Sequence, residues 1–273
     1  MKQITIIGGG WLGQPLAQCL ENIGHKVHVS RTTTQGVDEL TKKHLSGFEF
    51  DLNKDISELS TILNTLNPDI VIGCFPPGFR KGKGDEYAYH WSKLTQICQQ
   101  VGVARLVMVS STTVYPNIPQ EMSEERATLA LAQTSADFTD NAKVMLQAEQ
   151  YLIDSGLSYG VVRCSGLIGP DRHPARFVSK LKQVSNQAPA NMLHLHDAIG
   201  VTSFVALNTN NVVVNATTPN TVSKAEFYQA ALDQSGSNDP LPPITETADK
   251  RIVADRLIQL GYHFHFQHTL EML

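Results

Sequence analysis

Three glycines near the start of the chain have the spacing of a phosphate-binding turn. The stretch IIGGGWLG sets Gly8, Gly10 and Gly13 in a G-x-G-x-x-G pattern between a strand-like apolar run and a helix-like amphipathic run. Gly8 would permit the tight turn, Gly10 would let the backbone approach a pyrophosphate, and Gly13 would let the helix pack close to the strand. The phosphates would lie at the positive end of that helix. The turn, with Trp11 and Leu12 inside it, predicts a dinucleotide site; the alternative is a glycine turn that binds no ligand.

The residues that follow the second apolar run indicate which dinucleotide would bind. A carboxylate at this place favours NAD, because it hydrogen-bonds the ribose hydroxyls. The sequence here is SRTT and contains no acid. Ser30, Arg31 and Thr32 offer hydroxyls and a guanidinium, which suit a 2′-phosphate. We therefore expect NADP in preference to NAD; the alternative is that Arg31 is a solvated surface residue.

Short apolar runs alternate with helical patterns over the first 165 residues. The runs are ITIIGGG, HKVHVS, GFEFDL, DIVIGCF, RLVMVSS (105–111) and SYGVVRC (158–164). Unbroken apolar runs between helices are typical of a parallel sheet that is covered on both faces. This predicts an α/β fold with a Rossmann-type doubly wound parallel sheet, whose ligands bind at the carboxyl ends of the strands. We expect a dinucleotide domain over 1–165 and a smaller substrate-side region over 166–273, with some segments of the latter returning to the sheet.

A basic segment opens the second region. The stretch DRHPARFVSKLKQ (171–183) is expected to be helical. Arg172 and Arg176 are four residues apart, so on a helix both would face one way and could bind a phosphate or a carboxylate. The alternative is a solvated basic helix.

The composition limits the classes of function. The chain has 273 residues, 41% of them hydrophobic, and a net charge of −4, which does not favour nucleic acid or an anionic membrane as a partner. It has no apolar run of the ~20 residues that a membrane span needs, and no export signal is expected. The four cysteines form no CxxC pair, which fits reduced thiols in a cytoplasmic protein. His194 and His196 have no third ligand in view, so we expect no metal site.

Several motifs together resemble one superfamily. They are GGGWLG (8–13), DL (51–52), VSSTTVYP (109–116), RCSGLIGPDRHP (163–174), HLHDAIG (194–200) and KRIVADRLIQLGY (250–262). With them the chain resembles the short-chain dehydrogenase/reductase superfamily, in its extended or atypical branch, the NAD-dependent epimerase/dehydratase group. The resemblance covers nearly the whole chain. It implies the same Rossmann-type fold and a cofactor that binds at the strand ends.

The resemblance also implies site residues, position by position. The implied cofactor contacts are Asp51 and Leu52 beside the adenine, Cys74, Phe75 and Pro76 along the cofactor, and Ser165, Gly166 and Leu167 at the nicotinamide. The implied substrate contacts are Arg172, His173 and Arg176, in a cleft that often receives a nucleotide diphosphate sugar in the group. The helices expected near 88–101 and 141–155 are the pair that often forms dimers in the group, so a homodimer is possible.

The implied catalytic set lacks one member. Ser111 and Lys143 match the group's catalytic serine or threonine and its ribose-binding lysine, but Thr139 stands where the group has its proton-transferring tyrosine. A phenol has a pKa near ~10, and an alcohol is a far weaker acid. Tyr115, four residues after Ser111, is a possible substitute or a residue that packs under the site. Ser111 and Lys143 have structural alternatives as a strand-end serine and a solvated helix-start lysine.

Two functions therefore stay open. One is an NADP-dependent reductase-like or epimerase/dehydratase-like enzyme that acts on an anionic or sugar-like small molecule. The other is a non-catalytic NADP-binding protein that senses the redox state of the cofactor. The region 135–143, which holds Thr139 and Lys143, decides between them.

Overall fold

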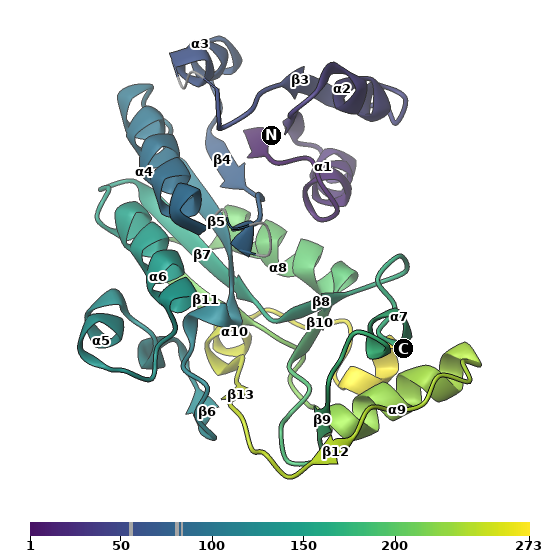
Figure 1. Ribbon diagram of the computed structural model, residues 1–273. Helices are drawn as coiled ribbons and strands as arrows, with labels where there is room; N and C mark the ends of the chain where they lie inside the picture. The colour runs from purple at the N-terminus through teal and green to yellow at the C-terminus, as the bar shows by residue number, and fades with distance from the viewer. Residues whose placement is uncertain (55–56, 80–81, 83) are drawn as a thin grey trace. The chain divides into compact units, whose positions relative to one another are not determined.

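The chain folds into two compact units, each built from several stretches of sequence. The computed structural model describes residues 1–54, 57–79, 82 and 84–273 (Figure 1). The first unit comprises Met1–Ser110, Lys143–Val162 and Val201–Val213, and the second comprises Ser111–Ala142, Arg163–Gly200 and Val214–Leu273. The expected division near residue 165 thus differs from these units, because the segment 111–142 belongs to the second one. Between the fifth and the sixth strand of the central sheet, the chain therefore passes through the second unit.

A seven-stranded sheet forms the centre of the fold, in the order β11-β7-β5-β4-β1-β2-β3. Its strands are β1 (Gln3–Ile7), β2 (Lys26–Arg31), β3 (Ser46–Glu49), β4 (Ile70–Gly73), β5 (Arg105–Ser111), β7 (Ser158–Cys164) and β11 (Val212–Ala216). β1 pairs in parallel with both β2 and β4, so the strand order reverses beside β1. This reversal is the switch point at which doubly wound sheets bind ligands. The predicted α/β architecture is confirmed.

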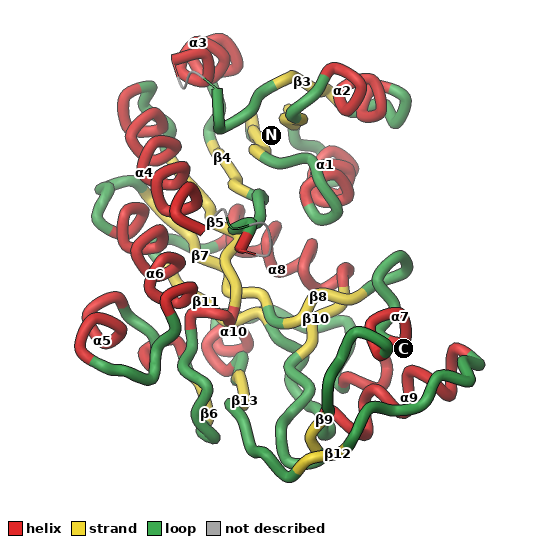
Figure 2. The backbone as a smooth tube through the Cα atoms, viewed as in Figure 1, coloured by secondary structure: helices red, strands yellow, loops and turns green. Residues whose placement is uncertain are grey.

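Helices cover the sheet of the first unit. They are α1 (Gly13–Asn22), α2 (Thr34–Thr41), α3 (Ser57–Leu66), α4 (Gly84–Gln100), α6 (Asp140–Ile153) and α8 (Leu195–Asn208), drawn in red in Figure 2. Side chains of β5 contact a different helix on each face of the strand. Arg105 donates from Nη2 to the carbonyl of Val205 in α8 (2.8 Å), whereas Ser110 donates to Glu149 in α6 (2.6 Å). Period-two alternation puts these two contacts on opposite faces, so both faces of β5 are buried.

The second unit consists of short elements that are joined by parallel pairing. Its two-stranded sheets pair β6 (Glu121–Met122) with β13 (Arg251–Ile252), β8 (Gly166–Ile168) with β10 (Met192–His194), and β9 (Val184–Ser185) with β12 (Ile244–Thr245). Its other helices are α5 (Leu129–Thr134), α7 (Ala175–Val178), α9 (Lys224–Ser235), α10 (Asp255–Gln259), and three 3-10 turns at Thr112–Val114, Glu124–Arg126 and Thr269–Met272. No helix among the described residues is long and apolar enough to cross a membrane.

The expected basic helix over 171–183 is wrong in its extent. Only Ala175–Val178 is helical, and Arg172 lies before it in an isolated antiparallel bridge with Gly169. Pro174 explains this, because a proline disfavours helical geometry in the residue before it and cannot donate a backbone hydrogen bond. Arg172 and Arg176 therefore do not share a helix face.

Asp197 joins two of the motifs that carry the family resemblance. This fully buried carboxylate lies in the first turn of α8. Its Oδ1 accepts hydrogen bonds from the Tyr262 hydroxyl (3.1 Å) and the His265 N–H (2.8 Å), and its Oδ2 accepts one from the Phe266 N–H (3.1 Å). The motifs HLHDAIG and KRIVADRLIQLGY thus meet through one side chain within the second unit.

Candidate functional site

The glycine turn after β1 is tightly packed. Gly8 has φ +107°, and a Cβ there would lie 3.0 Å from the carbonyl carbon of Cys74. A Cβ on Gly13 would clash with the carbonyl oxygen of Gly8, so only a glycine at residue 13 lets α1 start this close to the turn. Ser30 braces the turn twice, because its Oγ accepts the N–H of Gly8 (2.9 Å) and its carbonyl accepts that of Gly9 (2.8 Å).

Gly10 differs from these neighbours because, apart from the residues on either side of it in the chain, no heavy atom among the described residues lies within 4 Å of the place of its missing Cβ. Its φ is not in the left-handed range either. Neither packing nor backbone strain within this part of the chain therefore requires a glycine here. A ligand that approaches the backbone closely would require one, and the first N–H groups of α1 follow directly. The turn thus fits a bound pyrophosphate.

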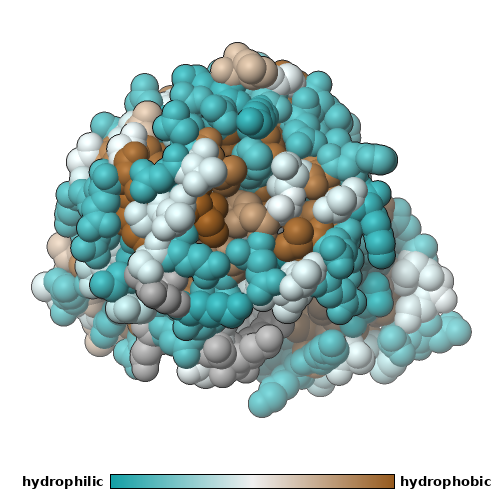
Figure 3. All heavy atoms as spheres, turned by 90° about the horizontal axis from the view of Figure 1, so that it is seen from above, coloured by the Kyte–Doolittle hydropathy of each residue, from teal (hydrophilic) through white to brown (hydrophobic). Residues whose placement is uncertain are grey.

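The turn opens into a cavity of about 500 Å³ in the first unit. Its wall comes from the ends of β1, β2, β3 and β4. Figure 3 shows one face of the molecule, on which hydrophobic residues (brown) lie among hydrophilic ones (teal). The predicted cofactor residues in the wall are Gly8, Gly10, Ser30, Arg31, Thr32, Asp51, Leu52, Cys74, Phe75 and Pro76. Trp11, Leu12 and Gly13 carry the chain from the turn into α1, and Leu12 is buried. The structure thus brings the predicted strand-end residues to one place.

Sequence reasoning missed the helical wall of this cavity. The additional lining residues are Ile7, Gly9, Thr33, Phe50, Asn53, Pro77, Gly78, Glu86, Tyr87 and His90. The last three lie on α4, at spacings of three and four residues that share one helix face. One sequence signal pointed to them. Gly73 ends a buried strand, and a Cβ there would clash with the ring of Trp91 on α4, so the glycine marks a close approach by that helix.

Arg31 is held against the turn rather than in solvent. Its Nη1 donates to the Gly9 carbonyl (2.6 Å), and its Nη2 forms an ion pair with Glu39 on α2 (2.8 Å). Ser30 was expected to offer its hydroxyl to a ribose phosphate, but this side chain is 2% exposed and braces Gly8 instead. Thr33 accepts the Gly36 N–H and so caps the start of α2 beside the cavity (3.1 Å).

Asp51 supplies a carboxylate to the cavity at the end of β3. Its Oδ1 accepts hydrogen bonds from the backbone N–H (3.0 Å) and the side-chain amide (2.7 Å) of Asn53. The backbone hydrogen bond is the main cause that holds the pKa of Asp51 below its usual range. The group is therefore an ionised hydrogen-bond acceptor at neutral pH.

The two hydroxyls proposed for catalysis, one on the last residue of β5 and one after it, both have protein partners. Ser111 accepts the N–H of Thr113 (3.2 Å), and the two hydroxyls are 3.0 Å apart. Tyr115 is 1% exposed, donates to Asn215 Oδ1 (2.6 Å) and accepts from Arg163 Nη1 (3.0 Å). Burial raises the pKa of Tyr115 to about 12. These are the contacts of a structural tyrosine that stays protonated.

Thr139, at the position of the expected tyrosine, has a structural contact of its own. It accepts the N–H of Ala142 (3.2 Å), which is the hydrogen bond of an N-cap at the start of α6. Lys143 follows in the first turn of α6 and is half-buried. Lys143 belongs to the first unit, and Ser111, Tyr115 and Thr139 belong to the second.

The remaining predicted residues all lie in the second unit. Ser165 is buried, Gly166 and Leu167 are in β8, and Gly166 donates to the Asn191 carbonyl (3.1 Å). Arg176 donates to the Asp171 carbonyl (3.1 Å), and burial lowers the pKa of Arg172. His173 accepts the Ala175 N–H at 3.4 Å. Among the described residues, no group of three or more His, Cys, Asp or Glu side chains could hold a metal ion. His194 and His196 are therefore not part of such a group.

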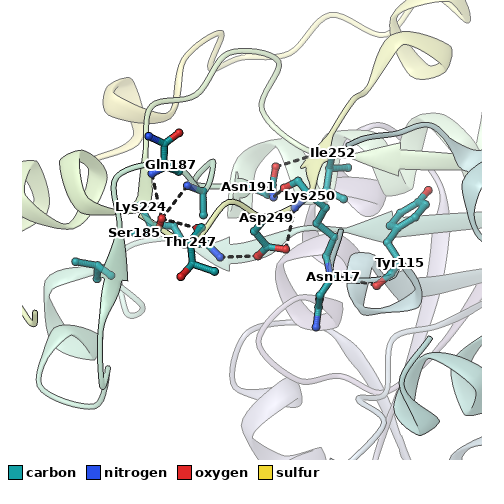
Figure 4. A network of polar contacts seen from close by, with 12 residues as sticks. Tyr115, Asn117, Ser185, Gln187, Asn191, Lys224, Thr247, Asp249, Lys250 and Ile252 are labelled. Atoms are coloured by element: carbon teal, nitrogen blue, oxygen red, sulfur yellow. Dashed lines mark hydrogen bonds and ion pairs between the residues drawn. The ribbon is translucent and has the colours of Figure 1, made fainter. Parts of the chain in front are cut away.

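A polar network in the second unit contains a lysine that sequence reasoning left without a role (Figure 4). Lys250 donates to the carbonyl of Tyr115 (3.1 Å) and to Asn117 Oδ1. Asn191 binds the same segment twice, through the Lys250 carbonyl (2.9 Å) and the Ile252 N–H (2.9 Å). The network fixes the segment after β5 to residues more than a hundred positions later in the chain. Burial lowers the pKa of Lys250.

Asp249 of this network predicts a measurable pH dependence of stability. Burial acts to raise its pKa, but hydrogen bonds from Lys224 (2.9 Å) and the Lys250 N–H outweigh it and hold the pKa below its usual range. The stabilisation is therefore present above the unfolded pKa of ~3.9 and is lost as the pH falls through the folded pKa. We expect Asp249→Asn to cost about 1 kcal/mol at pH 7, roughly 2–4 °C in Tm, and less at pH 3.

Thermal unfolding at the two pH values measures this loss. Asp239→Asn is the control, because Asp239 is an exposed aspartate of the same unit. An Asp249→Asn deficit that stays as large at pH 3 as at pH 7 would contradict the assignment.

The fold agrees with comparisons to known proteins. The model of the NAD dependent epimerase/dehydratase family matches residues 4–196, which is well over half of the chain. The chain therefore belongs to the NAD dependent epimerase/dehydratase family, and the resemblance seen in the sequence is confirmed. Protein YeeZ of Escherichia coli (strain K12) is 26% identical, with all of this chain and 99% of YeeZ aligned.

Two solved structures share the fold. The Bordetella bronchiseptica enzyme WbmH, in complex with NAD+, has a TM-score of 0.77 and 20% identity, with 100% of this chain and 96% of that chain covered. The UDP-glucose 4-epimerase of Thermus thermophilus, in complex with NAD, has a TM-score of 0.77 and 17% identity, with 98% of this chain and 96% of that chain covered.

Proposed function

We propose that this protein binds NADP in the cavity of the first unit and acts as a reductase-like or epimerase-like enzyme on an anionic or sugar-like small molecule. The observation that carries the proposal is the open space at Gly10, on the wall of a cavity of about 500 Å³. The membership of the family supports the same reading. A bound nicotinamide would supply a hydride acceptor or donor, which the side chains of the protein lack.

The preference for NADP is supported by the end of β2. Arg31 and Thr32 line the cavity there, and the start of α2, capped by Thr33, adds the positive end of a helix. No acid follows β2 directly. Glu39 balances part of the charge of Arg31. To bind a 2′-phosphate, the Arg31 guanidinium would have to contact the phosphate in addition to Glu39 or in place of it.

The roles that we propose for the chain's own residues follow the family positions. Lys143, in the first turn of α6, would hold the ribose at the nicotinamide, and Ser111 would orient the reacting oxygen. Arg172, His173 and Arg176 would bind the anionic part of the substrate. Because Thr139 and Tyr115 have structural contacts, a water held by Ser111 or an acidic neighbour of Thr139 would carry the proton. The homodimer through 88–101 and 141–155 stays a prediction.

The same contacts favour a second candidate, a non-catalytic protein that senses the redox state of NADP. Both hydroxyls that could replace the missing tyrosine are engaged in the fold. In this case the cofactor would bind without hydride exchange.

Hydride exchange separates the two candidates. We expect the protein to transfer deuterium from labelled NADPH to a member of a panel of sugar nucleotides and carbonyl compounds. Ser111→Ala and Lys143→Ala should each lower this rate at least tenfold, because each removes a group that would position the reacting atoms, and small misplacements can cost about 10²-fold. Tyr151→Phe, an exposed tyrosine on the same helix as Lys143, is the control. Tight NADPH binding with no exchange for any compound would favour the sensor.

A further inference from the structure

Tyr87 has a buried hydroxyl without an acceptor. The residue lies on α4, is 2% exposed and lines the cavity of the first unit. Its hydroxyl has no hydrogen-bond acceptor among the described residues, and the neighbour that can donate to it is the indole of Trp91. Its ring is fixed by two neighbours, with ring centroids 5.9 Å from Phe75 and 6.4 Å from Trp91 in edge-on geometry. Phe75 in turn stacks on Trp91 at 4.8 Å. The hydroxyl therefore cannot turn to another part of the chain without moving this aromatic cluster.

A buried hydroxyl without an acceptor needs an explanation. Leaving one unsatisfied costs about 1–3 kcal/mol, and nearly all buried polar groups in native proteins have a partner. A phenylalanine would fill the same space in the cluster without this cost. The hydroxyl at this position is thus unfavourable for the unliganded fold and becomes favourable once an acceptor enters the cavity.

The chemistry of the hydroxyl defines that acceptor. Burial raises the pKa of Tyr87, so the phenol stays protonated and neutral at physiological pH. The indole of Trp91 is a neighbour, but an indole N–H can only donate and so cannot accept the phenol proton. A neutral phenol can donate one hydrogen bond, and it does not repel a phosphate as a carboxylate would. Phosphate and ribose oxygens are acceptors of this kind.

The position of Tyr87 selects one half of a dinucleotide. The backbone nitrogen of Phe75 lies 3.1 Å from the place of the missing Cβ of Gly8, so the ring of Phe75 links the glycine turn to Tyr87. His90, one turn further along α4, lines the same cavity as Asp51 at the end of β3. Tyr87 thus lies between the residues of the phosphate turn and those of the expected adenine end.

We propose that the Tyr87 hydroxyl donates a hydrogen bond to an oxygen of the adenosine diphosphate half of the bound dinucleotide. The inference rests on the proposed binding of a dinucleotide in this cavity. It adds a residue from α4, outside the strand ends, to the groups that hold the cofactor. Tyr87 would contribute to affinity and not to the stability of the unliganded protein.

Tyr87→Phe tests this, because it removes only the hydroxyl. Affinities for NADPH and for 5′-ADP are measured by isothermal titration calorimetry, and the Tm of the unliganded protein is measured alongside. We expect both ligands to bind roughly five- to tenfold more weakly, which is the range of one net hydrogen bond. The Tm without ligand should stay unchanged or rise. Tyr89→Phe, two residues away on α4 and 57% exposed, should change neither quantity.

Four results would overturn the inference in distinguishable ways. Unchanged affinity for both ligands in Tyr87→Phe would overturn it alone, and would indicate that a buried water satisfies the hydroxyl. Weakened NADPH binding with unchanged 5′-ADP binding would overturn the assignment to the adenosine diphosphate half. A Tm that falls by several degrees without ligand would show a structural hydrogen bond instead. A wild-type protein that binds neither ligand would overturn the proposed function together with the inference.

Discussion

Gly13→Ala is expected to abolish dinucleotide binding and to destabilise the first unit. The new Cβ would clash with the carbonyl oxygen of Gly8, which is backbone and cannot swing aside. Either α1 shifts away from β1 or the turn opens. Forcing extra atoms into a packed site typically costs about 1–3 kcal/mol. We expect a Tm lowered by several degrees and an NADPH affinity weakened at least a hundredfold, measured by thermal unfolding and calorimetry.

Gly10→Ala is the matched control, in the same turn just before the start of α1. Its Cβ would enter open space, so the unliganded protein should unfold at the wild-type temperature or slightly above. The affinity for NADPH should still fall, because the methyl group occupies the space through which a pyrophosphate approaches the backbone. Equal loss of stability in both variants, or full NADPH affinity in Gly10→Ala, would contradict this description of the turn.

Asp197→Ala is expected to destabilise the second unit strongly. The substitution removes the fully buried carboxylate that accepts hydrogen bonds from the Tyr262 hydroxyl and from two backbone N–H groups, all three partly buried. Each unsatisfied group costs about 1–3 kcal/mol of the free energy of unfolding. Because the surrounding chain can partly relax, we expect a total loss of about 3 kcal/mol. For a protein of this size the Tm should fall by roughly 6–12 °C.

Thermal unfolding at pH 7 measures this effect. Asp197→Asn keeps one acceptor oxygen and should lose less stability than Asp197→Ala. Tyr262→Phe removes one of the three donors and should cost about 1 kcal/mol. An Asp197→Ala variant that unfolds within about 1–2 °C of the wild type would show that this carboxylate does not join the two motifs in solution.

The local patterns of the sequence were sufficient to predict the sheet. The expected runs 105–111 and 158–164 coincide with β5 and β7 as the structure has them. Both are unbroken apolar stretches of a strand buried on two faces, and this signal needs no information from distant residues. The glycine turn was predictable for the same reason, since its spacing and its flanking elements are local.

Features that depend on distant packing were not predictable in the same way. The wall formed by Glu86, Tyr87 and His90 exists because α4 packs against β4, and a helical sequence does not show which face meets a cavity. The second unit is built from pairs such as β6 with β13, whose members are more than a hundred residues apart. The sequence also did not show the partners of Thr139 and Tyr115, which turn two candidate acids into structural residues.

The expected helix over 171–183 is wrong in its extent, and the reason is visible in the sequence itself. The spacing of basic residues favoured a helix, but Pro174 restricts the residue before it, and only Ala175–Val178 is helical. Arg172 lies outside the helix and Arg176 lies within it. The prediction that both bind one ligand from the same helix face is therefore wrong.

A fluorescence titration with NADPH and with NADH tests the central claim, that the first unit binds NADP, most directly. Trp11 follows the glycine turn, and Trp91 is fully buried behind Phe75 of the cavity wall, so both tryptophans can transfer energy to a reduced nicotinamide. We predict saturation by NADPH at a much lower concentration than by NADH. No saturation by either dinucleotide would contradict the claim, and with it both proposed functions and the role of Tyr87.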